Sequence, residues 1–228
     1  MVKKGFLIVI EGIDGSGKST QVKLLGKRLN EMGLGVKQIE FPTYTKSSSL
    51  LEMYLNGDFG KNPEDVSPYV SSVFFAVDRY ASFNTDWKRD YNEGKVILTG
   101  RYTTSNAIHQ GSKMNGADRD KFLEWLEDFE YGIMGIPRPD VVLFLDMPPD
   151  YSAKLINNRY HDNDGKKDVH ERDSDYLKKC YETAIEISER LNWKRINCIK
   201  NHMIRNVEDI NDEIMREVKG IINKNDRI

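Results

Sequence analysis

The chain has 228 residues, of which 39% are hydrophobic and 31% are charged, so it is long enough for one globular α/β domain with a full core. Its 34 basic and 36 acidic side chains leave a formal net charge of −2, which argues against a nucleic-acid partner because duplex-binding proteins usually carry a basic excess. The sequence has no signal-peptide pattern, no apolar run near the ~18 residues of a membrane span, and no zinc-ligand spacing around Cys180 and Cys198. We therefore expect a cytoplasmic protein that binds neither a membrane nor zinc.

The first part of the chain is expected to form a strand, a helix and a second strand. Phe6–Ile10 is a continuous apolar run, which is typical of a strand buried on both faces. Lys18–Met32 is predicted to be a helix, because apolar residues recur there at helical spacing and Gly33 suits its C-terminal cap. The apolar face of that helix comprises Val22, Leu25, Leu29 and Met32. Val36–Phe41 is predicted to be the second strand.

A long helix is expected in the next part of the chain. It begins at Pro68, which follows the capping residue Ser67, and it is predicted to run to about Tyr91. Its buried stripe is expected to comprise Val70, Val73, Phe74, Val77 and Ala81. Val96–Thr99 is predicted to be the third strand, and Lys121–Tyr131 is predicted to be helical.

Strands and helices also alternate in the last part of the chain. Val141–Leu145 is predicted to be the fourth strand, and another helix begins over Tyr151–Asn158. The polar, charged segment Arg159–Lys167 is typical of a mobile loop between two helices. Asp173–Leu191 is then predicted to be a helix, and Ile196–Ile199 the fifth strand.

The overall pattern predicts one α/β domain. Asn206 is expected to cap a final helix. The apolar side of that helix comprises Val207, Ile210, Ile214, Val218 and Ile221. Strands that alternate with helices favour a parallel sheet with helices on both faces. Because no Gly/Ser/Pro-rich linker divides the sequence, we expect a single domain over residues 1–228, with a mobile lid at about residues 159–170.

A phosphate-binding loop follows the first predicted strand. Gly12–Ser19 matches G-x-x-x-x-G-K-[ST] without a mismatch, between a buried strand and an amphipathic helix. Its backbone N–H groups can point at one anion, Lys18 can reach the β and γ phosphates, and the Ser19 hydroxyl can bind Mg²⁺. We therefore predict a three-layer P-loop NTPase fold with a five-stranded parallel sheet. The residues expected to bind ATP are Gly12, Asp14, Gly15, Ser16, Gly17, Lys18, Ser19 and Thr20.

Six segments in a fixed order resemble those of thymidylate kinases, over about residues 6–191. They are EGIDGSGKSTQ at 11–21, FPTY at 41–44, FAVDR at 75–79, GRYTTSNAIHQ at 100–110, PDVVLFLD at 139–146 and DVHERD at 168–173. No single segment after the P-loop is specific, but their order and spacing are typical of the family. The resemblance implies a homodimeric enzyme that transfers a phosphoryl group from ATP to thymidine monophosphate (dTMP) with Mg²⁺.

An aromatic ring and an arginine form the expected base site. Phe75 and Arg79 are four residues apart and share one face of the predicted helix. From the residues alone, Phe75 could be a core residue and Arg79 an ion-pair residue. The resemblance implies instead that Phe75 stacks on thymine and that Arg79 contacts its O4. Ser105 and Asn106 match positions near the base, and a capping or turn role stays open for both.

The expected phosphate site of the acceptor centres on Arg101. This residue follows a strand end, where ligands of parallel α/β sheets bind, and its planar fork suits a phosphate. The resemblance implies that Arg101 and Tyr44 contact the phosphate of dTMP, with Phe41 and Pro42 leading into that loop. The surface-loop alternative for Tyr44 stays open.

Charged residues around the lid complete the candidate site. Gly15 stands where some family members have an arginine, and the resemblance implies that Arg159, Lys166 and Lys167 take over neutralisation of the transferring group. It also assigns Glu171 to substrate binding. From composition alone, these residues could belong to a solvated charged loop.

The metal site and two departures from the family pattern concern other residues. The resemblance implies that Asp14 contacts the acceptor sugar and the metal shell, which makes Asp14 and Ser19 the candidate metal ligands. The family usually has Asp-Arg-Tyr where this chain has Gly100–Tyr102, so an acid of the metal and phosphate network is missing. His109 stands where the family often has Tyr near the sugar C2′. The resemblance implies that this Tyr rejects a 2′-hydroxyl, so a histidine here is expected to make the preference for deoxyribose less strict.

The sequence therefore predicts an ATP-dependent thymidylate kinase in which Lys18, Asp14, Arg101 and the lid cations carry out catalysis by placement and charge neutralisation. One alternative is a kinase for another pyrimidine nucleotide or nucleoside. A second is a nucleotide-binding regulator with weak transfer activity, and a third is an interaction protein that uses ATP as a structural ligand.

Overall fold

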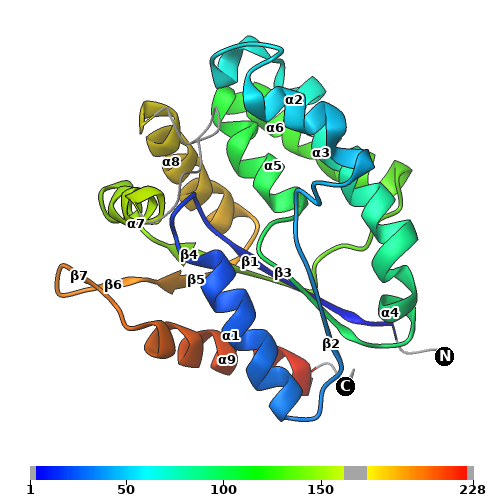
Figure 1. The fold of residues 1–228 in the computed structure, drawn as a ribbon, viewed down its shortest axis with the longest axis vertical. Coiled ribbons are helices and arrows are strands. Elements are labelled where there is room, and N and C mark those ends of the chain that lie inside the picture. Colours follow the sequence, from blue (N-terminus) through cyan, green and yellow to red (C-terminus); the bar gives the residue numbers. More distant parts are fainter. Residues whose placement is uncertain (1–3, 162–173, 225–228) are drawn as a thin grey trace.

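The computed structural model describes residues 4–161 and 174–224 (Figure 1). Five strands form one sheet in the order β2-β3-β1-β4-β5, and all neighbouring strands are parallel. The strands are β1 Phe6–Glu11, β2 Val36–Ile39, β3 Val96–Thr99, β4 Val141–Asp146 and β5 Lys194–Asn197. The predicted α/β fold with a five-stranded parallel sheet is confirmed, with every strand close to its expected place.

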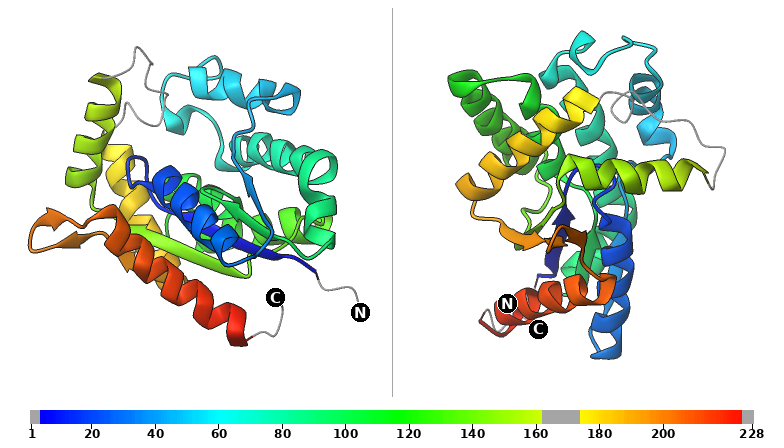
Figure 2. Two further views of the ribbon diagram at one scale, coloured as in Figure 1. Left: turned by 60° about the horizontal axis from the view of Figure 1, so that its bottom comes forward. Right: turned by 90° about the vertical axis from the view of Figure 1, so that its left-hand side faces the viewer.

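Two helices cover one face of the sheet. They are α1, Lys18–Glu31, and α9, Val207–Lys224, which lie side by side (Figure 2). Phe6, Ile8 and Ile10 point toward them, because alternate residues of a strand face opposite sides. The buried helix residues in this layer are Val22, Leu25, Leu29, Ile210, Ile214, Met215 and Val218. This layer forms the largest part of the core and anchors the start of α1 beneath the phosphate-binding loop.

The other face of the sheet is covered by the segments that carry the acceptor-site residues. Leu7 and Val9 pack against Phe83 and Trp87. Further along the sheet, a second cluster joins β4 to α5, Thr103–His109, and α8, Ser174–Arg190. It comprises Ile13, Ile108, Phe144, Tyr176, Cys180 and Ala184. Helices therefore flank the sheet on both faces, as the sequence predicts.

The long helix expected from Pro68 forms, with an interruption. Helix α3, Pro68–Ser82, leads into the π-helical turn η3, Phe83–Trp87, and then into α4, Lys88–Asn92. Its expected buried stripe is wrong, because Val70 and Val77 are 48% and 44% exposed. The other three stripe residues, Val73, Phe74 and Ala81, are only half-buried.

Small and polar residues occupy the face of α3 that packs inward. Ser71, Ser72 and Ala76 are fully buried, and Asp78 and Arg79 on the same side are 1% exposed. Asp78 and Arg79 have hydrogen-bonding partners inside the protein. These partners offset the cost of burying the two charges, so the apolar pattern does not decide which face of α3 is buried. Met32 is a second correction: it is 49% exposed, because α1 ends at Glu31 before Met32 could join its buried face.

The remaining elements complete the chain. They are η1 Lys46–Ser48, α2 Ser49–Asn56, η2 Pro63–Asp65, η4 Gly111–Lys113, α6 Gly116–Glu127, the π-helical turn η5 Asp128–Ile133, α7 Pro149–His161, and a hairpin of β6 Ile199–Lys200 and β7 Met203–Ile204. Helices α2 and α5 and the hairpin were not predicted from the sequence. Helix α7 continues to His161, past the expected start of the loop at Arg159, and most of the expected lid lies outside the described residues. In the described ranges, every helix is too short or too polar to cross a bilayer.

Candidate nucleotide-binding site

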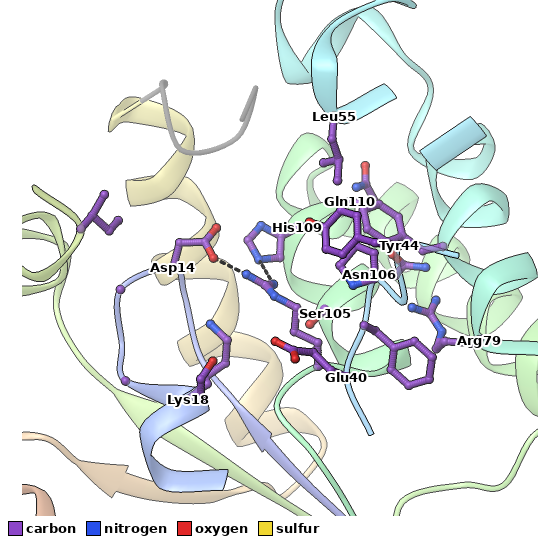
Figure 3. Close-up of a pocket in the computed structure, with 18 of the residues that line it drawn as sticks. Asp14, Lys18, Glu40, Tyr44, Leu55, Arg79, Ser105, Asn106, His109 and Gln110 are labelled. Carbon is purple, nitrogen blue, oxygen red and sulfur yellow. Dashed lines mark hydrogen bonds and ion pairs between the residues drawn. The ribbon is translucent and has the colours of Figure 1, made fainter. Parts of the chain in front are cut away.

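A cavity of about 500 Å³ opens at the carboxyl ends of three neighbouring strands. Asp14 follows β1, Phe41 follows β2, and Arg101 follows β3, and all three line the cavity. This edge is where parallel α/β sheets bind ligands, because the connecting loops diverge there. Figure 3 shows the phosphate-binding loop on one side of the cavity and residues of α3 and α5 on the other.

The phosphate-binding loop has the backbone that its glycines allow. Gly12, Gly15 and Gly17 have φ values of 156°, 75° and 91°, which favour glycine. Lys18 Nζ donates to the carbonyl oxygens of Gly12 and Ile13, each at 2.8 Å. The start of α1 faces the cavity, so its free N–H groups and dipole favour an anion there.

Ser16 is a buried polar residue of the phosphate-binding loop. Its side-chain Oγ is buried and has no hydrogen-bond partner among the described residues. Buried hydroxyls are nearly always paired. Ser16 does not line this cavity, and its hydroxyl lies beside Gly12 within the loop.

Helix α7 packs directly against Gly15. A Cβ atom added to Gly15 would lie 2.5 Å from the Ser152 carbonyl oxygen and 2.7 Å from Cγ1 of Ile156. The loop therefore has no room for an arginine at this position. This packing agrees with the expectation that any additional cation comes from elsewhere in the chain.

Residues of α3 and α5 form the opposite wall of the cavity. The expected base-site residues Phe75, Arg79, Ser105 and Asn106 all line it, together with His109. Ser105 also donates to the buried carboxylate of Glu11 at 2.8 Å. The structure thus brings the two expected halves of the site into one cavity.

A buried carboxylate holds two of these residues from behind. Nε and Nη2 of Arg79 each donate to Glu130 at 2.6 Å, and both side chains are almost completely buried. Burial lowers the pKa of Arg79, but the charge of Glu130 and the hydrogen bonds to it together outweigh burial, so the pKa is raised and the guanidinium stays charged. Glu130 also accepts from Asn106 Nδ2 at 3.4 Å. Sequence reasoning missed Glu130, because nothing local marks it as a site residue.

Arg101 joins the phosphate-binding loop to the acceptor wall. Its Nη2 forms an ion pair with Asp14, and its Nη1 lies 3.2 Å from Nε2 of His109 (Figure 3). Behind His109, burial raises the pKa of the Cys180 thiol to about 12, so this cysteine stays neutral. The guanidinium of Arg101 thus lines the cavity between Asp14 of the phosphate-binding loop and His109 of α5.

The loop after β2 is held in place by Asp78 of α3. Asp78 accepts from the backbone N–H of Thr43 at 2.8 Å and from the hydroxyls of Thr43 and Ser47 at 2.5 Å and 2.6 Å. Tyr44 in this loop is 65% exposed and reaches the cavity, as do Phe41 and Pro42. Asp78 is a second residue that sequence reasoning missed, although it lies inside the FAVDR segment.

Glu40 and Gly100 lie beside each other at the same edge. Ile39 pairs with Thr99 in the sheet, so the next residue of each strand also lies alongside its neighbour. Glu40 lines the main cavity and a second cavity of about 320 Å³, which also contains Ser19 and Gly100. A Cβ atom on Gly100 would make ordinary contacts at 3.5 Å. Glu40 is a third missed residue, and the register of β2 with β3 is the signal that finds it.

Several expected residues lie outside what the structure describes. Lys166, Lys167 and Glu171 fall within residues 162–173. The backbone of Arg159 belongs to α7, but its side chain is not among the described ones. Their roles stay predictions. The cavity-lining residues that the sequence did not suggest are Glu40, Leu55, Gln110, Leu155 and Ile156.

Comparison with known proteins agrees with this geometry. The family model "Thymidylate kinase" matches residues 10–211. A probable thymidylate kinase of Thermococcus onnurineus is 32% identical over 217 residues, which cover 93% of this chain and 96% of the relative. The thymidylate kinase of Plasmodium falciparum is 29% identical over 96% of this chain and 92% of its own, and that of Mycobacterium tuberculosis is 29% identical over 74% and 79%. A match of this extent, together with a phosphate-binding loop that faces the expected base-site residues, shows that the chain belongs to the thymidylate kinase family.

Proposed function

We propose that this protein transfers the γ-phosphoryl group of ATP to dTMP, giving dTDP and ADP. The observation that supports this most is the single cavity shared by Lys18, Arg101 and Arg79. Its span from the phosphate-binding loop to the α3–α5 wall suits two nucleotides with their phosphates facing each other. A regulator or an ATP-stabilised interaction protein would need only the first half.

The polarity of the α3–α5 wall favours thymine over cytosine. Asn106 donates its amide N–H groups to Ser72 and Glu130, so its carbonyl oxygen is the amide atom left for a ligand. Arg79 uses Nε and Nη2 for Glu130, and Nη1 is the nitrogen outside that pair. A donor beside an acceptor matches the O4 and N3–H of thymine, whereas cytosine would present a donor to the arginine and an acceptor to the carbonyl oxygen.

Phosphoryl transfer requires correct placement of the two nucleotides and neutralisation of the charge on the transferring group. A phosphate oxygen of dTMP is already a nucleophile, so the transfer needs no protein base. Lys18 would follow the charge of the transferring group, and Arg101 would aim the acceptor phosphate at it. Arg159, Lys166 and Lys167 are proposed to add positive charge from the lid, and Glu171 to contact the substrate.

The cavity also suits Mg²⁺, which prefers oxygen ligands and is usually held by nucleotide phosphates with one or two carboxylates. The Ser19 hydroxyl and the Asp14 and Glu40 carboxylates line the same cavity. We propose that Ser19 and Asp14 hold the ion and that Glu40 provides the negative charge that Gly100 lacks. When bound, the ion would neutralise charge on the phosphates.

The acceptor preference can be tested with a panel of nucleotides in a coupled ADP-release assay with ATP and Mg²⁺. We expect kcat/KM for dTMP to exceed that for dCMP by about a hundredfold or more, because a site built for one hydrogen-bonding edge rejects the other. The value for dUMP should lie between them, since it presents the same edge without the methyl group. A preference for cytidine nucleotides, or tight ATP binding without acceptor-dependent ADP release, would reject the proposal.

Replacement of Glu40 by glutamine is expected to weaken divalent-ion binding about tenfold, on the scale of residues that support a metal site. The measurement is Mn²⁺ binding to the ADP complex by electron paramagnetic resonance, alongside the Mg²⁺ dependence of the rate. Glu31→Gln is the control, because Glu31 is exposed at the end of α1 and away from the cavity. Equal Mn²⁺ affinity in the two variants would remove Glu40 from the metal site.

We also propose that the protein is a homodimer that uses the outer face of α3. Val70, Val77 and Tyr80 are 48%, 44% and 44% exposed, and their spacing puts them on one face of this helix. Exposed apolar side chains gathered on one face mark interaction sites. Val77→Asp is expected to shift the protein to monomers in light scattering after size exclusion, whereas Val207→Asp on α9 should not. A wild-type monomer at micromolar concentration would contradict the proposal.

A cytoplasmic location is proposed as well, supported by the free thiols of Cys180 and Cys198.

A further inference from the structure

We propose that Glu130 is a positioning residue that sets which pyrimidine the site accepts, by fixing the orientation of Arg79 and Asn106. The proposal rests on the proposed function, because it concerns the base of the acceptor nucleotide. Glu130 lines neither of the two cavities described above, so it would act through Arg79 and Asn106, which line the larger one.

Glu130 accepts hydrogen bonds from three residues on two helices. Arg79 of α3 donates to Oε2 and Oε1, each at 2.6 Å. Thr103, at the start of α5, donates to Oε2 at 2.8 Å, and Asn106 of the same helix donates to Oε1 at 3.4 Å. Both carboxylate oxygens are therefore used twice, and the donors come from the two helices that form the base wall.

The environment of Glu130 makes this arrangement rigid. The side chains of Glu130 and Arg79 are 0% and 2% exposed, so neither charge has water to replace its partner. A buried charge without a partner is strongly unfavourable, which holds the two planar groups in their bidentate geometry. Rotation of the Arg79 guanidinium or of the Asn106 amide would break bonds that the surroundings cannot replace.

As a consequence, the cavity wall presents a hydrogen-bond donor from Arg79 and an acceptor from Asn106 at fixed positions. While Glu130 accepts from Nε and Nη2 of Arg79, Nη1 is the nitrogen left for a ligand. While Glu130 and Ser72 accept from Asn106 Nδ2, the amide carbonyl oxygen is left for a ligand. A neutral amide at position 130 could offer one acceptor and one donor in place of two acceptors, so this arrangement would no longer be enforced.

The local backbone gives an independent reason to assign a role to Glu130. It lies in η5, a π-helical turn that follows α6 directly. A π turn inserts a residue into a helix and re-aims the side chains after it, and such turns are rare overall but frequent at functional sites. Here the turn places a charged side chain in the interior, behind the cavity wall.

The test compares Glu130→Gln with Glu127→Gln. Glu127 lies three positions earlier, is 44% exposed and pairs with Arg138 on the surface, so it controls for loss of one charge near the same turn. Binding of dTMP and dCMP is measured by calorimetry without ATP, and kcat and KM for both acceptors are measured with ATP. We expect Glu130→Gln to weaken dTMP binding about tenfold or more and to reduce the preference of dTMP over dCMP by a similar factor, since hydrogen-bond readout is worth at least that much. The KM for ATP should stay within about twofold of wild type.

Thr103→Val covers the case in which Glu130→Gln does not fold. This variant keeps the buried ion pair and removes one hydrogen bond to Glu130, so it should fold and should reduce the preference for dTMP in the same direction by a smaller factor. If whichever of these two variants folds keeps the wild-type preference of dTMP over dCMP, the positioning role is wrong. A wild-type protein with no preference for dTMP would instead reject the proposed function itself, so the two failures are distinguishable.

Discussion

Replacement of Lys18 by alanine is expected to reduce kcat by about 10²–10³-fold or more, with the fold unchanged. The Lys18 ammonium group lies at the end of the phosphate-binding loop, where it donates to the Gly12 and Ile13 carbonyl oxygens. With ATP bound, the ammonium group would donate to a nucleotide phosphate instead. Removal of one preorganised hydrogen-bond donor to a transition state typically has an effect of that size. The measurement is steady-state kinetics with saturating dTMP and varied ATP.

The matched control for Lys18→Ala is Lys27→Ala on the same helix. Lys27 is 72% exposed in its side chain and pairs with Glu31 one turn later, so its loss should leave kcat and the KM for ATP near wild type. Circular dichroism would show that both variants keep the fold. Turnover within tenfold of wild type in Lys18→Ala would mean that the transferring phosphate does not depend on this loop.

Substitution of Gly15 by arginine is expected to weaken ATP binding strongly, even though the family resemblance implies an arginine at this place in some members. The new Cβ would lie 2.5 Å from a backbone oxygen of α7, which cannot move like the end of a side chain, and φ is 75°. The loop or α7 would have to shift, which would displace the backbone N–H groups of the loop that bind phosphate. We expect the ATP dissociation constant to rise by about a hundredfold or more, because several charge-assisted hydrogen bonds depend on those groups.

Gly33→Ala separates this clash from the general strain of a left-handed glycine. Gly33 has a similar φ of 84°, but a Cβ there would have nothing within 4 Å. Gly33→Ala should therefore lower the free energy of unfolding by the cost of the backbone strain, about 1–2 kcal/mol, without changing ATP affinity. If Gly15→Arg bound ATP as tightly as Gly33→Ala, the packing of α7 on the loop would not limit this position.

The sequence was sufficient for features that depend on local pattern. The phosphate-binding loop is a contiguous motif, and the strands are short apolar runs, so both could be predicted at their places. Their order also predicted that Arg101 would lie near the loop, because parallel strands end at one edge. The family resemblance then indicated Phe75, Arg79 and Asn106, which the structure places in that same cavity.

The residues that the sequence missed depend on contacts between distant segments. Glu130 lies 51 positions from Arg79, and Asp78 lies 35 positions from Thr43, so no local pattern joins either pair. The same reason explains the wrong face of α3. Amphipathic spacing assumes that apolar residues go inside, whereas this helix turns Asp78 and Arg79 inward to partners that only the folded chain provides.

The ion pair between Asp14 and Arg101 has a consequence for how the two nucleotides influence each other. The Arg101 guanidinium pairs with the Asp14 carboxylate, so a phosphate monoester that binds Arg101 has to compete with that carboxylate. If Asp14 turns to the metal of the first nucleotide as proposed, Arg101 is released for the second. Thermodynamic linkage then requires the effect to be mutual, so each nucleotide should raise the affinity for the other by the same factor.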